Sequence, residues 1–279
     1  MHHPHPAVSQ PVAAWLSALR AATRRGPHPG RIPLRLGDAQ IGSVAAEILN
    51  EIGPKRLLDK RYQLSFEESD GAPALTLPAE QASAALNALA ALLREVGRCG
   101  PWRNEQLAVR DAAGRQRATV ERGAVRVLGI ATDAVHLVGL TEDASAVWVQ
   151  QRSRTKPSHP GQWDTLMGGM VSARDSLRDA LARETQEEAG LQLSALTHLQ
   201  AGAAVLLDQP SDEGGAGLGH LHERVHWWSA RLPQAVMPVN QNGEVERFAC
   251  WSHAEVQARL AARAFTPEAA LVLGAFYEE

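Results

Sequence analysis

The sequence predicts an α/β protein with two domains: a small α+β domain over residues 1–120 and a larger α/β domain over residues 121–279. Strand-like and helix-like patterns alternate along the chain, which is typical of this class. The pattern changes near residue 126, where longer strands begin. A chain of 279 residues, 44% of them hydrophobic, is long enough for one large domain or two ordinary ones.

The first 100 residues contain the elements of the small domain. Residues 12–22 form a short helical pattern that GPHPG ends. Two strand pairs follow: RIPLRL and AQIGSV flank Gly37-Asp38, and YQLSFE and ALTL flank the turn SDGAP. The stretch AEQASAALNALAALLREVG predicts a helix, because its apolar side chains share one stripe and Gly97 ends it. LAVRDAAGRQRATVE then suits a further hairpin.

The second domain begins with two strands, AVHLVGL and AVWVQQR, across the polar turn TEDAS. A loop rich in glycine and proline, SRTKPSHPGQWDTLMGGM, leads to a helix predicted over residues 172–189. Strands HLQAGAAVLL and RVHWWSARL flank the loop DQPSDEGGAGLGHLH. The strand RFACW precedes a helix opened by a capping box, Ser252 with Glu255, and the last helix has Thr266 as N-cap and Pro267 at its first position.

Composition and charge argue against several classes of partner. The net charge of −3 and a pI near 6.4 give no positive field for nucleic acid or anionic lipid, so neither a nucleic-acid nor a membrane partner is expected. No apolar run approaches the roughly 18 residues that a membrane span needs. Two cysteines, Cys99 and Cys250, are too few for a disulfide framework and suit a reducing compartment. We therefore expect a cytoplasmic protein.

The helix over residues 172–189 carries acidic side chains where an apolar stripe should continue. Leu177, Ala180 and Leu181 share one helical face, which should be buried. Two turns later this face meets three carboxylates: Glu184, Glu187 and Glu188. Carboxylates that face a core are costly unless a cation neutralises them, and an oxygen-only ligand set suits Mg²⁺ or Mn²⁺. Arg183 lies beside Glu187 on the helical wheel and could hold it in place. The alternative is a solvated acidic helix end.

The residues around this helix resemble the Nudix box, G-x5-E-x7-R-E-U-x-E-E-x-G-U, in which U is aliphatic. Gly169, Asp175 and the stretch RETQEEAGL over residues 183–191 match seven of its nine fixed positions. Asp175 stands where the family has Glu, at the predicted start of the helix, where an acidic side chain can act as a cap. Thr185 stands where the family has an aliphatic residue, and we predict that it faces away from the acidic face. Neither change touches the three glutamates.

The resemblance covers about residues 120–276, through the stretches VHLVGL, RSRTKPSHPGQWDTLMGGM, NGEVERFACWSHAEV and FTPEAALVLGAF. These are similar to a Nudix subgroup with an extra N-terminal domain, which includes the Nudix-like half of fungal proteins fused to thiamine pyrophosphokinase. The resemblance implies an α/β/α sandwich with a mixed sheet and metal-dependent hydrolysis of a small-molecule diphosphate. For this subgroup it implies a substrate resembling thiamine diphosphate or a damaged form of it. A homodimer is one possible assembly.

The resemblance and the residue chemistry together give the predicted site. The metal ligands for Mg²⁺ or Mn²⁺ are Glu184, Glu187 and Glu188. The catalytic residues are Glu187, Arg183 and Glu244, with either Glu187 or Glu244 deprotonating the attacking water. The substrate-binding residues are Arg152, Lys156, Gly168, Gly169 and Trp163. The cations would pair with phosphates, the glycines would let backbone N–H groups approach them, and Trp163, with Trp227 and Trp228, would face a cationic ring. The alternative roles are surface charge for the two cations, turn formation for the glycines and core packing for the tryptophan.

A competing metal motif is His222-Glu223-Arg224-Val225-His226, which has the H-E-x-x-H spacing of zinc metalloproteases. That motif needs a helix, so that both imidazoles can bind one metal ion. Here glycines precede the motif and β-type residues follow it. In a strand, residues four apart are separated by about 13 Å, too far for two histidines to bind one zinc ion. We therefore predict a strand without a zinc site.

Three alternative functions share the fold or the box. Isopentenyl-diphosphate isomerase resembles the chain around HPGQWD but needs a catalytic cysteine where this chain has Leu166 and Met167. A non-catalytic nucleotide sensor usually has a degraded box and a basic appendage, whereas this box keeps its acids. A pyrophosphatase acting on ADP-ribose, NADH or another nucleotide stays open, because no residue here recognises a thiamine ring uniquely.

Overall fold

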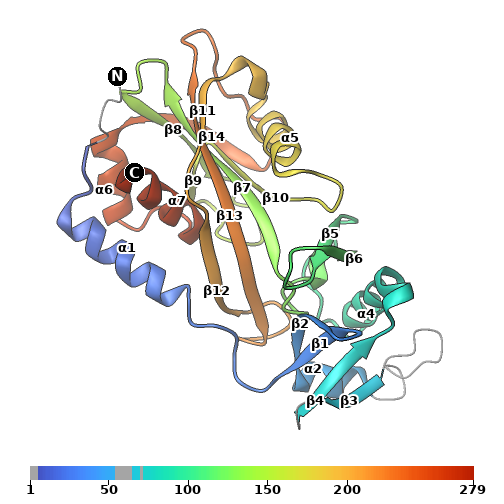
Figure 1. Ribbon diagram of the computed structural model, residues 1–279. Coiled ribbons are helices and arrows are strands. Elements are labelled where there is room, and N and C mark those ends of the chain that lie inside the picture. The colour runs from blue at the N-terminus through green and yellow to red at the C-terminus, as the bar shows by residue number, and fades with distance from the viewer. Residues whose placement is uncertain (1–5, 54–64, 70–71) are drawn as a thin grey trace.

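The computed structural model has two parts, a large sheet with helices on both faces and a smaller N-terminal α+β unit (Figure 1). The structure describes residues 6–53, 65–69 and 72–279. The predicted strand YQLSFE lies partly outside the described residues, because residues 62–64 precede its described portion. Two residues of the predicted SDGAP turn, Asp70 and Gly71, also lie outside them.

A four-stranded sheet with the order β2–β1–β4–β3 organises the N-terminal unit. The elements of this unit are β1 (Arg31–Leu36), β2 (Ala39–Ala45), α2 (Ala46–Ile52), β3 (Ser65–Ser69), β4 (Ala72–Leu77), η1 (Ala79–Gln81) and α4 (Ala82–Glu95). Strand β1 pairs antiparallel with β2 and parallel with β4, and β3 pairs antiparallel with β4. The predicted stripe of α4 is buried at Leu86, Leu89 and Leu93, which confirms the prediction of this helix.

A hairpin connects this unit to the large sheet. It consists of β5 (Gln106–Arg110) and β6 (Gln116–Glu121), as predicted, and the 3-10 turn η2 (Arg122–Ala124) follows it. The hydrophobic core of the N-terminal unit continues beyond the hairpin through Val125, Leu128 and Ile130 and also includes Met170 from the large sheet. Residues 124–130 therefore join the two parts through packed side chains rather than through a free linker.

In the part of the chain that the structure describes, eight strands form the large sheet. They are β7 (Thr132–Thr141), β8 (Ala146–Arg152), β9 (Trp163–Asp164), β10 (Met167–Met170), β11 (Thr197–Ala201), β12 (Val205–Ser211), β13 (Gly219–Leu232) and β14 (Val245–Ser252). The main path is β11–β13–β7–β8–β14, and β10, β12 and β9 pair with β7, β13 and β8 respectively. Strands β7 and β13 are parallel and the other pairs are antiparallel, so the predicted mixed sheet is confirmed.

Helices cover both faces of this sheet. Helix α5 (Leu177–Ala189) and the short turn η3 (Leu193–Ala195) share a core with Val135 and Leu137 of β7. Helices α6 (His253–Ala261) and α7 (Pro267–Glu278) pack on the opposite face, in a core that contains Ala134 and Val138. Successive side chains of β7 thus alternate between two cores, as the strand repeat requires. The α/β/α sandwich is therefore confirmed. None of the helices within the described residues is long and apolar enough to cross a membrane.

Four segments differ from their sequence-based prediction. The helix predicted over residues 172–189 begins only at Leu177, and the predicted strand HLQAGAAVLL is divided between β11 and β12. The predicted glycine-rich loop is mostly strand, because β12 and β13 pair from Val205–Val225 to Ser211–Gly219 and leave residues 212–218 to connect them. The end of the predicted loop SRTKPSHPGQWDTLMGGM forms β10. This strand makes hydrogen bonds with backbone groups at the edge of β7.

Helix α1 (Gln10–Ala22) packs against the C-terminal helices rather than against the N-terminal sheet (Figure 1). Val12 and Leu16 are buried in the core that α6 and α7 form. A side chain at Gly274 of α7 would lie 2.8 Å from Leu16 Cδ1, so the two helices approach closely there. We retain a domain boundary near residue 120 as a proposal, with α1 packed across it.

Leu16→Ala is expected to lower the free energy of unfolding by about 2–5 kcal/mol, because it leaves a cavity between α1 and α7. Urea unfolding followed by circular dichroism would measure this change. Ser17→Ala, on the exposed face of the same helix, is the matched control and should change stability by less than about 0.5 kcal/mol. Equal unfolding midpoints for Leu16→Ala and wild type would show that α1 is not docked in solution.

Candidate active site

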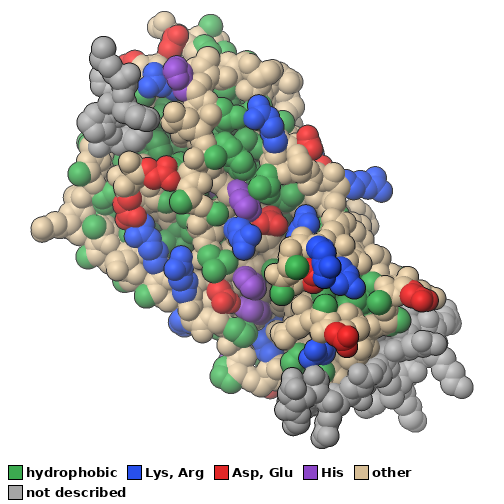
Figure 2. Space-filling model, viewed as in Figure 1, with side chains coloured by type: hydrophobic (Ala, Val, Ile, Leu, Met, Phe, Trp, Pro, Cys, Tyr) green, Lys and Arg blue, Asp and Glu red, His purple; other side chains and the backbone are tan. Residues whose placement is uncertain are grey.

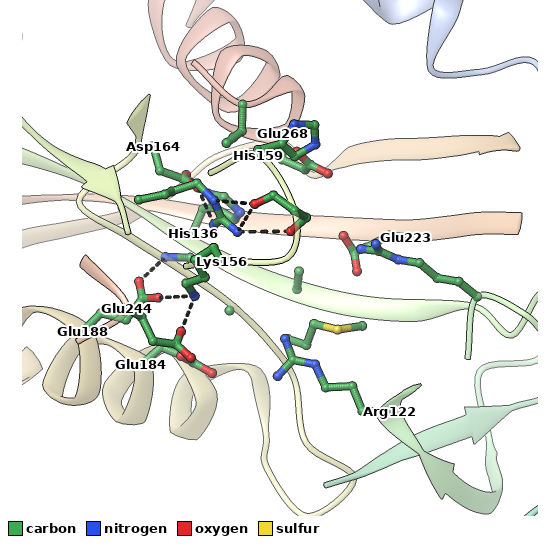
Figure 3. A pocket seen from close by; sticks show the side chains of 18 residues that line it. Arg122, His136, Lys156, His159, Asp164, Glu184, Glu188, Glu223, Glu244 and Glu268 are labelled. Atoms are coloured by element: carbon green, nitrogen blue, oxygen red, sulfur yellow. Dashed lines mark hydrogen bonds and ion pairs between the residues drawn. The ribbon is translucent and has the colours of Figure 1, made fainter. Parts of the chain in front are cut away.

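A charged cleft opens where the large sheet branches. Strand β7 pairs with β10 over residues 134–137 and with β8 only at Gly139 and Leu140, so both strands occupy one edge of β7 in succession. Residues of both branches, of α5, of the start of α7 and of the segment that follows the connecting hairpin line the cleft (Figure 3). Its charged side chains are Arg122, Arg126, Arg152, Lys156, Asp164, Glu184, Glu188, Glu223, Glu244 and Glu268.

Two glutamates of α5 continue its buried face into this cleft. Glu184 and Glu188 are only 8% and 2% exposed, on the side of the helix that buries Ala180 and Leu181. The predicted continuation of the apolar stripe by carboxylates is confirmed for this pair. Glu187 lies at the edge of the same face, and its side chain is 50% exposed. The three predicted ligands are thus two buried carboxylates and one at the rim.

The buried carboxylates are held by polar groups from the strands beside α5. Glu188 accepts hydrogen bonds from Gln150 Nε2 at 2.8 Å and from the backbone N–H of Gly168 at 3.1 Å. Burial nevertheless raises the pKa of Glu188 to about 7, and it also raises the pKa of Glu184. Negative charge is therefore costly at both positions, and a cation bound nearby would stabilise the ionised forms.

Arg183 holds three carboxylates around the start of this acidic face. Its guanidinium lies 2.9 Å from Asp175, 2.8 Å from Glu184 and 3.1 Å from Glu187, so the predicted contact with Glu187 is present. The prediction that Asp175 caps the helix is wrong, because Ser176 is the N-cap. Asp175 instead uses its carboxylate to orient Arg183 across two helical turns.

Lys156 and Glu244 face the buried pair from the opposite wall of the cleft. The Lys156 ammonium contacts the Glu244 carboxylate and lies 3.8 Å from Glu188, so it bridges the two walls (Figure 3). Burial acts to raise the pKa of Glu244, but its hydrogen bond with Lys156 and the lysine charge lower it overall. Arg152 lies on the same wall and contacts Asp164 at 3.3 Å. The structure thus gathers all three of the predicted charged residues outside α5 in the cleft.

The two glycines before α5 lie directly against buried polar side chains. A Cβ atom at Gly169 would lie 2.1 Å from Glu184 Cδ, and one at Gly168 would lie 2.6 Å from the His136 ring. The N–H group of Gly168 donates to Glu188 rather than presenting a free donor to a phosphate. These glycines are therefore needed mainly because buried polar side chains pack directly on the β10 backbone.

The predicted aromatic surface is not assembled at the cleft. Trp163 is 5% exposed and packs with Trp251, at 4.2 Å between ring centroids, among the helices on the opposite side. Trp227 is buried in the same core, and its Nε1 group donates to Ala203. Trp228 packs in the other core, beneath α5. The tryptophans that were predicted to face a cationic ring are thus divided between two cores.

Other lining residues come from positions that sequence reasoning did not place in the site. His136, Glu268, Arg122 and Arg126 lie far from the box in the sequence, and only folding brings them to the cleft. Glu223 had a weak signal: it follows Leu221 and precedes Val225 at inward positions of β13, where an apolar residue would be expected. It accepts a hydrogen bond from Thr132 Oγ1 at 3.0 Å, and burial raises its pKa.

The chemistry of the cleft fits a hard divalent cation. Glu184, Glu188 and Glu244 offer carboxylate oxygens only, and the first two are buried at a cost that a cation would remove. In the described ranges, no three His, Cys, Asp or Glu side chains lie close enough together to hold a metal ion by themselves. Mg²⁺ retains several waters and commonly completes its shell with substrate phosphates, so an open carboxylate wall suits it.

The H-E-x-x-H motif lies within β13, so its predicted strand conformation is confirmed. Successive residues of the motif point to opposite faces: Glu223 is buried toward the cleft, whereas His222 and His226 are partly exposed on the other face. His226 Nε2 contacts Asp133 at 2.8 Å. Figure 2 shows histidine side chains at the surface along the course of β13. Strand geometry separates the two imidazoles too far for one zinc ion.

His222→Ala is expected to leave diphosphate hydrolysis within about twofold of wild type, because the side chain is on the face of β13 that points away from the cleft. Elemental analysis of the purified protein should find no stoichiometric zinc. One tightly held zinc ion per chain that disappears in His222→Ala would revive the metalloprotease hypothesis.

The sequence of this chain is similar to one protein family and to several curated proteins. A family model described as the NUDIX domain matches residues 131–270, which is half of the chain. The chain is 26% identical to Nudix hydrolase 24, chloroplastic, of Arabidopsis thaliana, over 70% of this chain and 53% of that protein. It is 31% identical to an uncharacterised Nudix hydrolase of Streptomyces coelicolor, over 59% of this chain and 84% of that protein. An uncharacterised protein of Saccharomyces cerevisiae is 27% identical over 62% of this chain and 53% of its own length. The chain thus spans about half the length of the yeast and Arabidopsis relatives.

Two solved structures superpose on part of this chain, each with a TM-score below 0.5. A Deinococcus radiodurans protein superposes with a TM-score of 0.48 and 20% identity, covering 62% of this chain and 99% of that chain. The dihydroneopterin triphosphate pyrophosphohydrolase of E. coli gives a TM-score of 0.39 and 21% identity, covering 52% of this chain and 94% of that chain.

Proposed function

Because the chain belongs to the Nudix family, we propose that it hydrolyses the diphosphate linkage of a small organic diphosphate and releases a monophosphate. One observation carries this proposal most strongly. The box residues Glu184 and Glu188 are buried, yet they line a polar cleft opposite Lys156 and Arg152. That arrangement would allow carboxylates on one side of the space to bind a cation and basic side chains on the other side to bind phosphates.

Each group of the chain has a distinct task in the proposed reaction. Glu184 and Glu188 would hold Mg²⁺ or Mn²⁺, with Glu187 at the rim, and Arg183 would keep Glu184 oriented. The bound cation would neutralise negative charge that develops on the phosphoryl oxygens. Lys156 and Arg152 would bind phosphate oxygens. When Lys156 turns to the substrate, Glu244 loses the contact that lowers its pKa and becomes a better proton acceptor for the attacking water.

We propose a substrate with a cationic heteroaromatic end, of the thiamine diphosphate type or a damaged form of it. The subgroup resemblance over residues 120–276 supports this choice. A second support is the pair of carboxylates Glu223 and Glu268, which line the cleft together with Arg126. Because the tryptophans lie elsewhere, charge rather than ring stacking would select the cationic end.

The substrate proposal is tested by kcat/KM for thiamine diphosphate and its oxidised analogues beside ADP-ribose, NADH and an oxidised dGTP, each with Mg²⁺. A tenfold advantage for any nucleotide would overturn the choice of substrate and leave the hydrolase proposal standing. Tight binding of nucleotides without turnover of any diphosphate would instead favour the non-catalytic sensor.

Glu187→Gln is expected to lower kcat by at least about 10²-fold with the fold intact, because Glu187 is one of the two candidate bases and a candidate ligand at the rim. Glu244→Gln is the matched variant across the cleft. The base is the residue whose removal also eliminates the acidic limb of the pH–rate profile. Near-normal turnover of a folded Glu187→Gln protein would show that Glu187 is neither the base nor an essential metal ligand.

A further inference from the structure

The segment that joins the N-terminal unit to the large sheet extends a cationic side chain into the catalytic cleft. Arg122 belongs to η2, which immediately follows the connecting hairpin, and it lines the same cleft as Glu184 and Glu188. In Figure 3, its guanidinium projects toward the side of the cleft where Glu184 lies. This position is far from the box in the sequence but close to it in space.

Arg122 lines the cleft together with carboxylates of both walls. Glu184 and Glu188 belong to one wall and Glu244 belongs to the other.

Arg122 keeps donors available for a ligand. Its Nη1 group contacts Glu105 at 2.8 Å, and its side chain is 34% exposed. Within the described part of the chain, its Nε and Nη2 groups donate to no protein acceptor. By contrast, Lys156 bridges two glutamates and Arg152 already donates to Asp164 and Ser158.

The segment that carries Arg122 is held firmly. Glu121, 1% exposed, accepts hydrogen bonds from the backbone N–H groups of Arg103 and Gly123. The hairpin before it is bonded to the loop that leads into α5, through a hydrogen bond of 2.8 Å from Ala173 N to Gln106 O. The orientation of Arg122 toward the box is therefore built into the contact between the two parts.

We infer that Arg122 binds a phosphoryl group of the substrate, so that the segment joining the N-terminal unit to the large sheet forms one wall of the catalytic site. This inference rests on the proposed function and deepens it, since it assigns a role at the site to this connecting segment. A guanidinium can offer two parallel N–H donors to phosphate oxygens while a third remains on Glu105. The recognised group is a diphosphate, whichever organic moiety it carries.

Arg122→Gln tests this role in the full-length protein. The variant should raise KM for the best diphosphate substrate about tenfold or more, with kcat changed less than about threefold, as expected for a lost charged hydrogen bond to substrate. Glu105→Gln is the matched control, because it removes the negative charge of the protein partner and leaves Arg122 in place. Its KM should stay equal to or fall below that of wild type.

A binding measurement provides an independent readout. Calorimetric titration with inorganic diphosphate and Mg²⁺ should show an affinity at least about tenfold weaker for Arg122→Gln than for wild type and Glu105→Gln. Unchanged KM and unchanged diphosphate affinity in Arg122→Gln would overturn the inference while hydrolysis by wild type stands. Equal losses in both variants would assign a structural role to the ion pair and would also overturn it. Wild type that hydrolyses no diphosphate would instead refute the proposed function.

Discussion

Glu188→Gln is expected to lower kcat by about 10³-fold at saturating Mg²⁺, with the fold intact. Glutamine has the size of glutamate and keeps a carbonyl oxygen that can accept the N–H group of Gly168. The variant therefore removes the charge and leaves the packing of α5 largely unchanged. Because Glu188 is only 2% exposed, solvent cannot compensate for the loss of its negative charge.

Stability should change in the direction opposite to activity. Burial raises the pKa of Glu188 to about 7. A carboxyl group whose pKa is higher in the folded than in the unfolded protein destabilises the fold above the unfolded pKa, increasingly as pH rises toward the folded value. Removing its charge should thus leave the unfolding midpoint at pH 8 unchanged or raise it, in the metal-free protein.

The experiment combines single-substrate kinetics with urea unfolding, both performed with chelator and with Mg²⁺. Wild type should lose turnover in chelator, and Mg²⁺ should stabilise it far more than it stabilises Glu188→Gln. Turnover within tenfold of wild type in the folded variant would refute the role of this helix in cation binding. A lowered midpoint in the metal-free variant would mean that Glu188 is a structural group.

Much of this site could be predicted because its signals are local. Glu184 and Glu188 stand at helical spacing from Ala180 and Leu181, so the pattern shows which face should be buried and that this face carries charge. Gly190 ends the helix in the left-handed conformation that the sequence suggests. The predicted strands AVHLVGL and RVHWWSARL likewise lie within the long strands β7 and β13.

The remainder depends on contacts between distant segments, which a single sequence does not specify. Nothing near Arg122 indicates that η2 will approach α5, because that approach depends on how the hairpin packs. The prediction that the tryptophans lie in the site was wrong for a related reason. The alternation of side chains along a strand predicts that Trp227 and Trp228 face opposite sides of the sheet, but it does not predict which side forms a cleft. Helix α1 has an amphipathic pattern whose partner, α7, lies at the other end of the chain.

Gly169→Ala is expected to lower kcat by at least about 10²-fold, because its new methyl group would occupy the space of the Glu184 carboxylate. The added Cβ would lie 2.1 Å from Glu184 Cδ and 2.4 Å from Oε1, far inside van der Waals contact. Since β10 is fixed by its pairing with β7, the carboxylate rather than the backbone should move. The overpacking should also cost about 1–3 kcal/mol of stability.

Gly168→Ala on the same strand is the matched control, because its methyl group would meet the His136 ring at 2.6 Å instead of a candidate ligand. Both variants introduce one methyl group into a crowded site, so a general effect of overpacking should appear in both unfolding curves. A specific effect on cation binding should appear only in Gly169→Ala, as weaker Mn²⁺ affinity by titration along with the lost turnover. If both variants lose Mn²⁺ affinity equally, the rigidity of β10 rather than the position of Glu184 controls the site. If Gly169→Ala binds Mn²⁺ and turns over like wild type, Glu184 is not a ligand, and the cation must be held by Glu188 with carboxylates from the opposite wall.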